Sequence, residues 1–139
     1  MGLVLVGLLV VAGIIVAFRE PAQFEPGTPE AATQDYLLAV LDEDYEAAHA
    51  LLTPELQRRC DVRDLDDRYY RSEGKRITLT ESRVDGDSAV IDLEFTATYS
   101  RDAFDFDQYS HEERFDLDRI DGEWRISDPP WPYYWCPEE

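Results

Sequence analysis

An unbroken apolar block at the start of the chain differs from everything that follows it. Residues 2–18 read GLVLVGLLVVAGIIVAF and contain no charged side chain. As a helix this block is about 26 Å long, close to the ~30 Å hydrocarbon core of a bilayer, and Met1 and Arg19 extend it at either end. A helix at a protein surface needs a polar face, which this block lacks. The pattern therefore predicts a transmembrane anchor over residues 1–18.

A cleaved signal peptide is the alternative interpretation of the same block. Such a peptide has a basic start and a small-x-small cleavage site. Met1 and Gly2 supply no basic residue, no convincing site follows Phe18, and no cysteine stands there to carry a lipid. We therefore expect an uncleaved single-pass anchor. Arg19, beside Glu20 on the domain side, leans weakly against export under the positive-inside rule.

After a short polar linker (19–27), the spacing of apolar residues becomes helical. Thr-Pro-Glu at 28–30 supplies an N-cap and a first-turn proline, and the same triplet recurs at 53–55. The acidic residues 42–44 interrupt the pattern and are expected to cap a second helix, which ends before the second triplet. A further helical stretch is expected over 64–72. The residues expected to face inward are Ala32, Tyr36, Leu37, Val40, Leu41, Tyr45, Ala48, Leu51, Leu52, Leu56, Cys60, Leu65 and Tyr69.

From Lys75 the apolar period changes to two, which indicates strands. The first strand is expected over 77–84, and Asp-Gly at 85–86 predicts a hairpin turn. Residues 89–99 alternate strictly and form the clearest strand, with one buried and one wet face. An acidic loop or bend is expected over 101–108. Phe115 and Leu117 then mark a third strand, and a second Asp-Gly turn at 121–122 leads to a last strand with Trp124 and Ile126 inward.

Helices followed by an antiparallel meander define an α+β layout. The Thr-Pro-Glu start, the Tyr36–Ala48 segment (Tyr-Leu-x-Ala-x-x-x-x-Asp-Tyr-x-x-Ala) and the Asp-Gly-x-Trp-x-Ile ending at 121–126 resemble the nuclear transport factor two-like superfamily. The closer likeness is to its bacterial membrane-anchored or lipoprotein members of unknown function. Over about 28–128 it implies helices packed on a curved antiparallel sheet, a cystatin-like cone shared with ketosteroid isomerases. It also favours an extracytoplasmic location, with residues 129–139 as a Pro/aromatic tail.

Charge narrows the range of partners. The chain has 31 acidic and 13 basic residues and a formal net charge of −18. Such a surface repels phosphate backbones, so nucleic-acid binding is excluded. It also repels anionic lipid headgroups, so we expect contact with the membrane through residues 2–18 alone.

The cone of the superfamily that the chain resembles holds a pocket, which could support catalysis or binding. The residues expected to line that pocket here are Tyr36, Tyr69, Phe95 and Trp124. By chemical type, the candidates for catalysis are Asp66, Tyr69, Glu81 and Asp92, and the residues that titrate near neutrality are His49 and His111. None matches the isomerase set position by position, and no Ser-His-Asp arrangement or glycine-rich phosphate loop is visible. We therefore expect no catalytic residue and no cofactor.

Metal and disulfide chemistry have few candidates in this sequence. Asp102, Asp105 and Asp107 offer hard oxygen ligands, but their spacing fails the EF-hand pattern, so we expect no calcium site. Cys60 and Cys136 stand outside any CxxC or Cys/His cluster, which excludes a zinc site. Two alternatives stay open for them: one disulfide, as suits an extracytoplasmic domain, or two buried thiols that never meet.

The C-terminal tail, PPWPYYWCPEE, is rich in proline and aromatic residues. It either folds back and closes the domain, or displays an aromatic surface to a partner. The residues of that surface are Trp131, Tyr133, Tyr134 and Trp135. Taken together, these patterns predict a non-enzymatic, membrane-anchored, extracytoplasmic domain that binds a protein partner or a small ligand. The alternatives are an isomerase or hydrolase that uses the cone, and a structural component of an envelope assembly.

Overall fold

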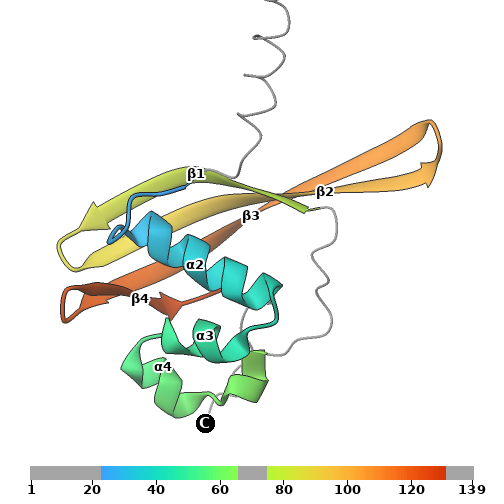
Figure 1. The fold of residues 1–139 in the computed structure, drawn as a ribbon. Helices are drawn as coiled ribbons and strands as arrows, with labels where there is room; N and C mark the ends of the chain where they lie inside the picture. The colour runs from blue at the N-terminus through green and yellow to red at the C-terminus, as the bar shows by residue number, and fades with distance from the viewer. Residues whose placement is uncertain (1–22, 66–74, 131–139) are drawn as a thin grey trace, which may run out of the picture.

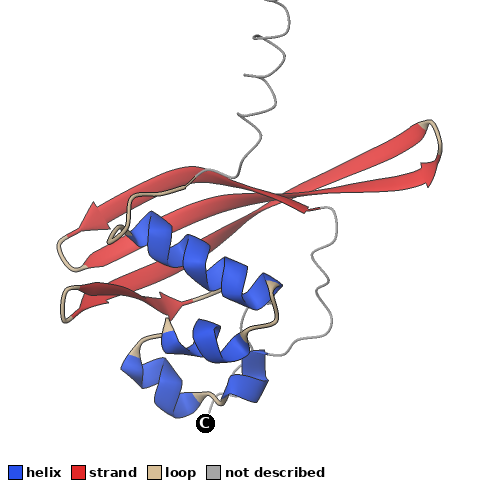
Figure 2. Cartoon of the chain, in the orientation of Figure 1, coloured by secondary structure: helices blue, strands red, loops and turns tan. Residues whose placement is uncertain are grey.

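The computed structural model describes residues 23–65 and 75–130, in which helices precede an antiparallel sheet (Figures 1 and 2). The helices are α2 (Pro29–Leu41), α3 (Tyr45–Ala50), α4 (Pro54–Arg59) and the 3-10 helix η1 (Val62–Leu65). The strands are β1 (Lys75–Asp85), β2 (Ser88–Asp102), β3 (Asp105–Ile120) and β4 (Glu123–Asp128). Figure 1 shows the helices gathered on one side of the sheet. The predicted α+β layout is therefore confirmed.

Local side-chain chemistry starts the helices where the sequence places them. Thr28 Oγ1 accepts a hydrogen bond from Ala31 N at 3.2 Å, and Thr53 Oγ1 accepts one from Leu56 N at 3.4 Å. Asp44 Oδ1 does the same for α3, accepting from Ala47 N at 3.1 Å. Each contact satisfies an amide that the first helical turn leaves unpaired.

The four strands pair in sequence order, β1-β2-β3-β4, all antiparallel. Both hairpins turn where the sequence has Asp-Gly, but in different ways. Asp121 and Gly122 form the β3–β4 turn with φ values of 52° and 81°, whereas Asp85 still pairs with Ser88, so Gly86 (φ 60°) and Asp87 form the β1–β2 turn. The β1–β2 register shifts between Leu79 and Glu81, a bulge that no sequence pattern announces.

The core lies between the helices and one face of the sheet. Tyr36 is fully buried, and its ring meets that of Phe115 edge to face, with centroids 6.1 Å apart. The alternation predicted for 89–99 is visible in the burial of its inward residues, although Thr96 on the opposite face is also buried. The remaining buried apolar residues of the cluster are Leu37, Ala48, Leu52, Leu56, Leu65, Ala89, Ile91, Leu93, Phe95, Leu117, Trp124 and Ile126.

The expectation of an acidic loop over 101–108 is wrong. β2 continues to Asp102 and β3 begins at Asp105, with Thr98 opposite Gln108 in the register. Only Ala103 and Phe104 remain between the paired ends. Backbone pairing tolerates alternating acidic side chains on a solvated hairpin, so acidity alone does not end a strand. The result is a long β2–β3 arm that projects beyond the other strands (Figure 1).

Two expected elements fall wholly or partly beyond the described residues. The anchor predicted over 1–18 lies outside them, and no helix within 23–65 or 75–130 is long and apolar enough to cross a membrane. The stretch expected over 64–72 begins within η1, which ends at Leu65, and residues 66–74 lie outside the described residues.

Candidate binding groove and the charged outer face

An apolar groove of about 500 Å³ runs between α2 and β1. Its volume falls within the roughly 300–1,000 Å³ typical of ligand sites. Leucine and isoleucine residues make up most of its lining, together with one aromatic residue and several polar ones. The lining residues are Phe24, Glu30, Thr33, Gln34, Leu37, Leu38, Leu41, Arg76, Ile77, Thr78, Leu79, Ile91 and Leu93.

The groove exists because α2 packs against β2 and β4 rather than squarely over β1. Leu37 turns inward and is buried, whereas the next residue, Leu38, stands at the margin of the groove with 50% of its surface exposed. Ile77 and Leu79 of β1 are only partly buried against the core. The inner side of β1 therefore keeps apolar side chains that the helix does not fully cover.

Residues from both faces of β1 line the groove, and among the described residues this strand pairs with β2 alone. Successive side chains of a strand point to opposite faces, so a groove on one face meets alternate residues. Here the four consecutive residues Arg76–Leu79 all line it. The groove therefore borders this stretch of β1 as a whole, and it reaches across to Ile91 and Leu93 of β2.

One polar contact ties α2 to the sheet at the groove, and a second one lies within α2. Ser82 Oγ of β1 donates a hydrogen bond to Glu30 Oε1 at the start of α2. Thr33 Oγ1 donates to the carbonyl oxygen of Pro29 at 2.9 Å, which satisfies a buried hydroxyl. Phe24, which precedes α2 outside any helix or strand, adds an aromatic ring to the lining.

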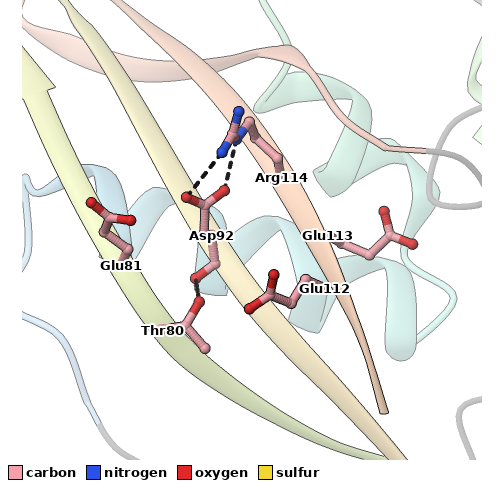
Figure 3. Close-up of a pocket in the computed structure, with 6 residues that line it drawn as sticks. All are labelled: Thr80, Glu81, Asp92, Glu112, Glu113 and Arg114. Carbon is pink, nitrogen blue, oxygen red and sulfur yellow. Dashed lines mark hydrogen bonds and ion pairs between the residues drawn. The ribbon is translucent and has the colours of Figure 1, made fainter. Parts of the chain in front are cut away.

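A second hollow of about 540 Å³ lies among charged residues, most of them on the outer face of the sheet (Figure 3). Asp92 of β2 stands at its centre. Arg114 of β3 donates from Nε to Asp92 Oδ1 at 2.7 Å, and Arg83 of β1 donates from Nη2 to Oδ2 at 3.2 Å. In Figure 3 Glu113 points away from Asp92, because neighbouring residues of a strand face opposite ways. The network links three strands from the solvent side.

The carboxylates around the sheet shift in opposite directions. The hydrogen bond from Arg114 lowers the pKa of Asp92 below its ordinary value, and Arg83 adds to this effect. Burial raises the pKa of Glu113, against the opposing influence of His111. Burial also raises the pKa of Asp116, and Asp128 across the β3–β4 pair raises it further. The pKa of Asp92 is lowered because its charged form is paired with arginines, whereas the pKa values of Glu113 and Asp116 are raised because burial disfavours their charged forms.

Three of the four residues predicted to line the pocket are buried in the core. Tyr36, Phe95 and Trp124 belong to one apolar cluster and are at most 8% exposed. They line neither the groove nor the charged hollow. The fourth residue, Tyr69, lies outside the described residues, as does Asp66.

The two histidines occupy different surroundings. His49 Nε2 lies 2.8 Å from the carbonyl oxygen of Cys60 in a partly buried hydrogen bond. His111 stacks between Phe95 and Tyr109, at centroid distances of 5.5 and 5.7 Å, and its Nε2 lies 3.3 Å from Glu113 Oε1. The second arrangement joins a histidine and a carboxylate on the inner face of the sheet.

The remaining candidates fall partly beyond the described residues. Within 23–65 and 75–130, no three histidine, cysteine or acidic side chains form a group that could hold a metal ion. Asp102 and Asp105 face each other at the end of the β2–β3 arm, and Asp107 follows in β3. Cys60 is buried, but Cys136 lies outside the described residues, so their pairing stays a prediction. The aromatic tail from Trp131 to Trp135 lies outside them as well.

Comparison with known protein families gives a match to this chain. The family described as Lipoprotein LpqB, N-terminal domain, matches residues 25–137. The chain belongs to this family. The matched region includes the whole sheet, most of the C-terminal tail and every lining residue of the groove except Phe24. No curated protein matches the chain.

Two solved structures resemble this LpqB N-terminal domain. A SEC-C motif containing protein from Rhodopseudomonas palustris is 21% identical, with a TM-score of 0.52, over 85% of this chain and 86% of that one. A protein of unknown function from Mycobacterium tuberculosis is 23% identical, with a TM-score of 0.42, over 70% of this chain and 64% of that one. The first likeness supports the fold alone.

Sequence reasoning missed the groove, although it expected some of its residues to face inward. Leu37, Leu41, Ile77 and Leu79 have apolar spacing that predicts burial, but spacing does not tell a packed residue from one beside a hollow. Leu38 is the residue that could have signalled it. It adds an apolar side chain next to the predicted inner face of α2, where a polar residue would be expected.

Proposed function

We propose that this LpqB N-terminal domain is a membrane-anchored, extracytoplasmic binding module without enzymatic activity, and that the groove between α2 and β1 is its binding site. The observation that carries the proposal is the groove itself: a hollow of about 500 Å³ lined mainly by aliphatic side chains on a domain that is otherwise strongly acidic. Apolar surface left open beside a packed core is typical of a site that another molecule covers.

The membrane part of the proposal has two supports. Residues 2–18 are long and apolar enough to cross a bilayer, and the family is described as a lipoprotein family, a class held at membrane surfaces. We propose that residues 1–18 form a single-pass anchor and that residues 19–27 connect it to a domain of the nuclear transport factor two-like, cystatin-like type. The α+β order of elements is consistent with that finer assignment.

A binding role is favoured over the enzymatic alternative by how the inner residues are used. Tyr36, Phe95 and Trp124 are buried in one apolar cluster, so they are part of the packed core. The carboxylate of Asp92 contacts two arginines, so its charge is already compensated. A general base needs an accessible carboxylate with a pKa near the working pH, and the lowered pKa of Asp92 is the opposite.

Site-specific photocrosslinking tests the groove whatever the chemistry of its ligand. The full chain is expressed in its host with Leu38 replaced by benzoylphenylalanine and is irradiated in intact cells. The matched control places the same group at Val84, which is 55% exposed on β1 but does not line the groove. We expect a discrete adduct from position 38 alone. No adduct at position 38, or equal adducts at both positions, would contradict the proposed site.

Protease treatment of the same intact cells tests the compartment. We expect cleavage of the domain without lysis, because the proposal places residues 28–139 outside the cytoplasm. Protection of the domain until the membrane is permeabilised would contradict the proposed location, and would leave the groove to be judged by the crosslinking result.

A further inference from the structure

We infer that the groove accepts an extended, basic polypeptide segment of a partner protein, which pairs with the edge of β1 and adds a strand to the sheet. The inference rests on the proposed function, since it names what the proposed binding site holds. Its support comes from the backbone of β1, the side chains around it and the charge of the chain.

The first step is the state of the edge. Within residues 23–65 and 75–130, β1 pairs with β2 alone and stands at the end of the order β1-β2-β3-β4. An edge strand presents a row of backbone N–H and C=O groups to whatever approaches it. Proteins commonly recognise extended peptides by adding them to such an edge, with main-chain hydrogen bonds giving affinity.

The second step separates a peptide from a purely aliphatic ligand. Four consecutive residues of β1, Arg76–Leu79, line the groove. On this inference, its wall includes main-chain polar groups of the strand edge as well as side chains. An aliphatic chain would cover those groups without bonding them, which is unfavourable because a buried polar group left unpaired loses its hydrogen bonds to water. An added strand would pair them. The mixed wall of the groove therefore favours a polypeptide.

The third step concerns side chains. The β1–β2 register is regular from Lys75 to Leu79, and the bulge begins only after Leu79. This length suits a short added strand, since strands of about five residues are common. An extended segment directs every second side chain to the same face, and on the inner side these would meet Leu38, Leu41 and Ile77. Phe24 already adds an aromatic ring to the lining from a segment without regular structure.

The fourth step is charge. The chain carries a net charge of −18. At the groove itself, α2 contains Glu30 and Asp35 but no basic residue, whereas β1 contributes Arg76 to the lining, so the preference for a basic segment comes from the field of the whole chain. A field of this sign speeds the approach of cationic segments and repels acidic ones. The segment that fits has apolar residues at alternate positions and lysine or arginine between them.

A peptide library on the full chain in lipid nanodiscs tests the inference. Alternate positions are drawn from Val, Ile, Leu and Phe, and the positions between them from Lys, Arg, Thr, Asp and Glu. We expect enrichment of basic members over acidic ones, and slower hydrogen exchange in Lys75–Leu79 when the best peptide binds. Raising the salt from about 0.05 to 0.5 M should weaken binding, because the Debye length falls severalfold.

Two matched pairs of variants distinguish strand addition from simple apolar contact. Leu38→Arg should weaken binding of the best peptide at least about tenfold, whereas Val84→Arg should leave it unchanged. Neither residue is buried, so both variants should fold. On the peptide side, N-methylation of one alternate set of amides should abolish binding, whereas methylation of the other set should be tolerated, because only one set faces β1.

The outcomes separate this inference from the proposed function. If no peptide is enriched, or if both methylated sets bind equally, strand addition at β1 is overturned. If a fluorescent fatty acid then binds and Leu38→Arg abolishes its binding, the groove remains a binding site and only the class of ligand was wrong. If position 38 also gives no photoadduct in cells, the proposed function fails together with the inference.

Discussion

β1 and β4 are the two edge strands of one sheet, but different parts of the chain lie beside their outer edges. At the β4 edge, Thr53 N donates to Ile126 O and Ile126 N donates to Leu51 O, each at 2.9 Å, so the turn between α3 and α4 pairs in parallel with the strand. Arg125 adds a side-chain hydrogen bond to the carbonyl oxygen of Ala50. Beside β1, an apolar groove lies between the strand and α2 instead.

The difference shows how a small domain can protect one edge and keep the other for binding. Exposed edges invite unwanted pairing, and natural proteins cover them or interrupt them. Here the helical half of the chain covers β4, whereas within residues 23–65 and 75–130 no segment pairs with the outer edge of β1, which has a bulge after Leu79 and charged residues nearby. Closure of β4 should therefore determine stability, and openness of β1 should determine binding.

The largest expected effect is on the closed edge. Leu52 is fully buried and forms the bridge to Ile126, so Leu52→Ala removes packing at the point where helices and sheet join. We expect a loss of about 2–5 kcal/mol in the free energy of unfolding, the usual cost of a Leu→Ala change in a core. Urea denaturation of the full chain in nanodiscs, followed by tryptophan fluorescence, measures it.

The matched control is the same substitution on the open side. Leu38→Ala alters a half-exposed residue at the groove, so it should change the free energy of unfolding by no more than about 0.5 kcal/mol. Equal losses from the two substitutions would show that the groove is part of the packed core, and would remove the contrast between the edges.

Sequence reasoning predicted the local features on both sides of the sheet better than the contacts between distant residues. The caps at Thr28, Asp44 and Thr53, the alternation over 89–99 and the two Asp-Gly turns are set by neighbours in the chain, and each is visible in the structure. Such features depend on local backbone geometry, which residue type largely determines.

The remaining features depend on contacts between distant residues, and periodicity carries no signal for these. The pairing of Leu52 with Ile126 joins residues that are 74 positions apart, and the groove depends on where α2 crosses the sheet. The Asp92 network is another case, since β1, β2 and β3 must align before Arg83 and Arg114 can meet one carboxylate. From the sequence alone, Arg83, Asp92 and Arg114 are expected to be ordinary solvent-exposed charges.

A smaller effect is expected from the outer-face network that holds the open-edge strand. Asp92→Asn keeps the shape of the side chain but removes the charge that Arg83 of β1 and Arg114 of β3 share. We expect a loss of about 1 kcal/mol at neutral pH, at the upper end for accessible ion pairs because two arginines are involved. Urea denaturation measures the loss, and hydrogen exchange should show faster exchange in β1 than in β4.

The pH dependence of this loss has a definite sign. The pKa of Asp92 is lower in the folded state than its ordinary value near 3.8, so its contribution is present above that value and is lost as the pH falls through the folded pKa. The control is Asp87→Asn, which removes a 76% exposed partner of Arg119 and should cost less than about 0.5 kcal/mol. An equal effect of both substitutions would contradict a special role for Asp92 in holding β1.

The smallest expected effect has the opposite sign and returns to the closed side. Asp116 of β3 lies opposite Asp128 of β4 in the register, and burial together with that neighbour raises its pKa. Like charges directly across a strand pair are destabilising. Asp116→Asn should therefore stabilise the chain by about 0.5 kcal/mol at neutral pH.

The gain from Asp116→Asn should disappear in acid, because a raised folded pKa means that protonation favours the folded state. That contribution is fully present below the unfolded value near 3.8 and is lost as the pH rises through the folded pKa. Wild type and variant should therefore have equal stability below about pH 3.8 and diverge above it, whereas Asp92→Asn diverges with the opposite sign. Urea titrations at several pH values test both. If Asp116→Asn instead lowers stability at neutral pH, the carboxylate supports the β3–β4 pair, and closure of this edge depends on charge as well as on Leu52.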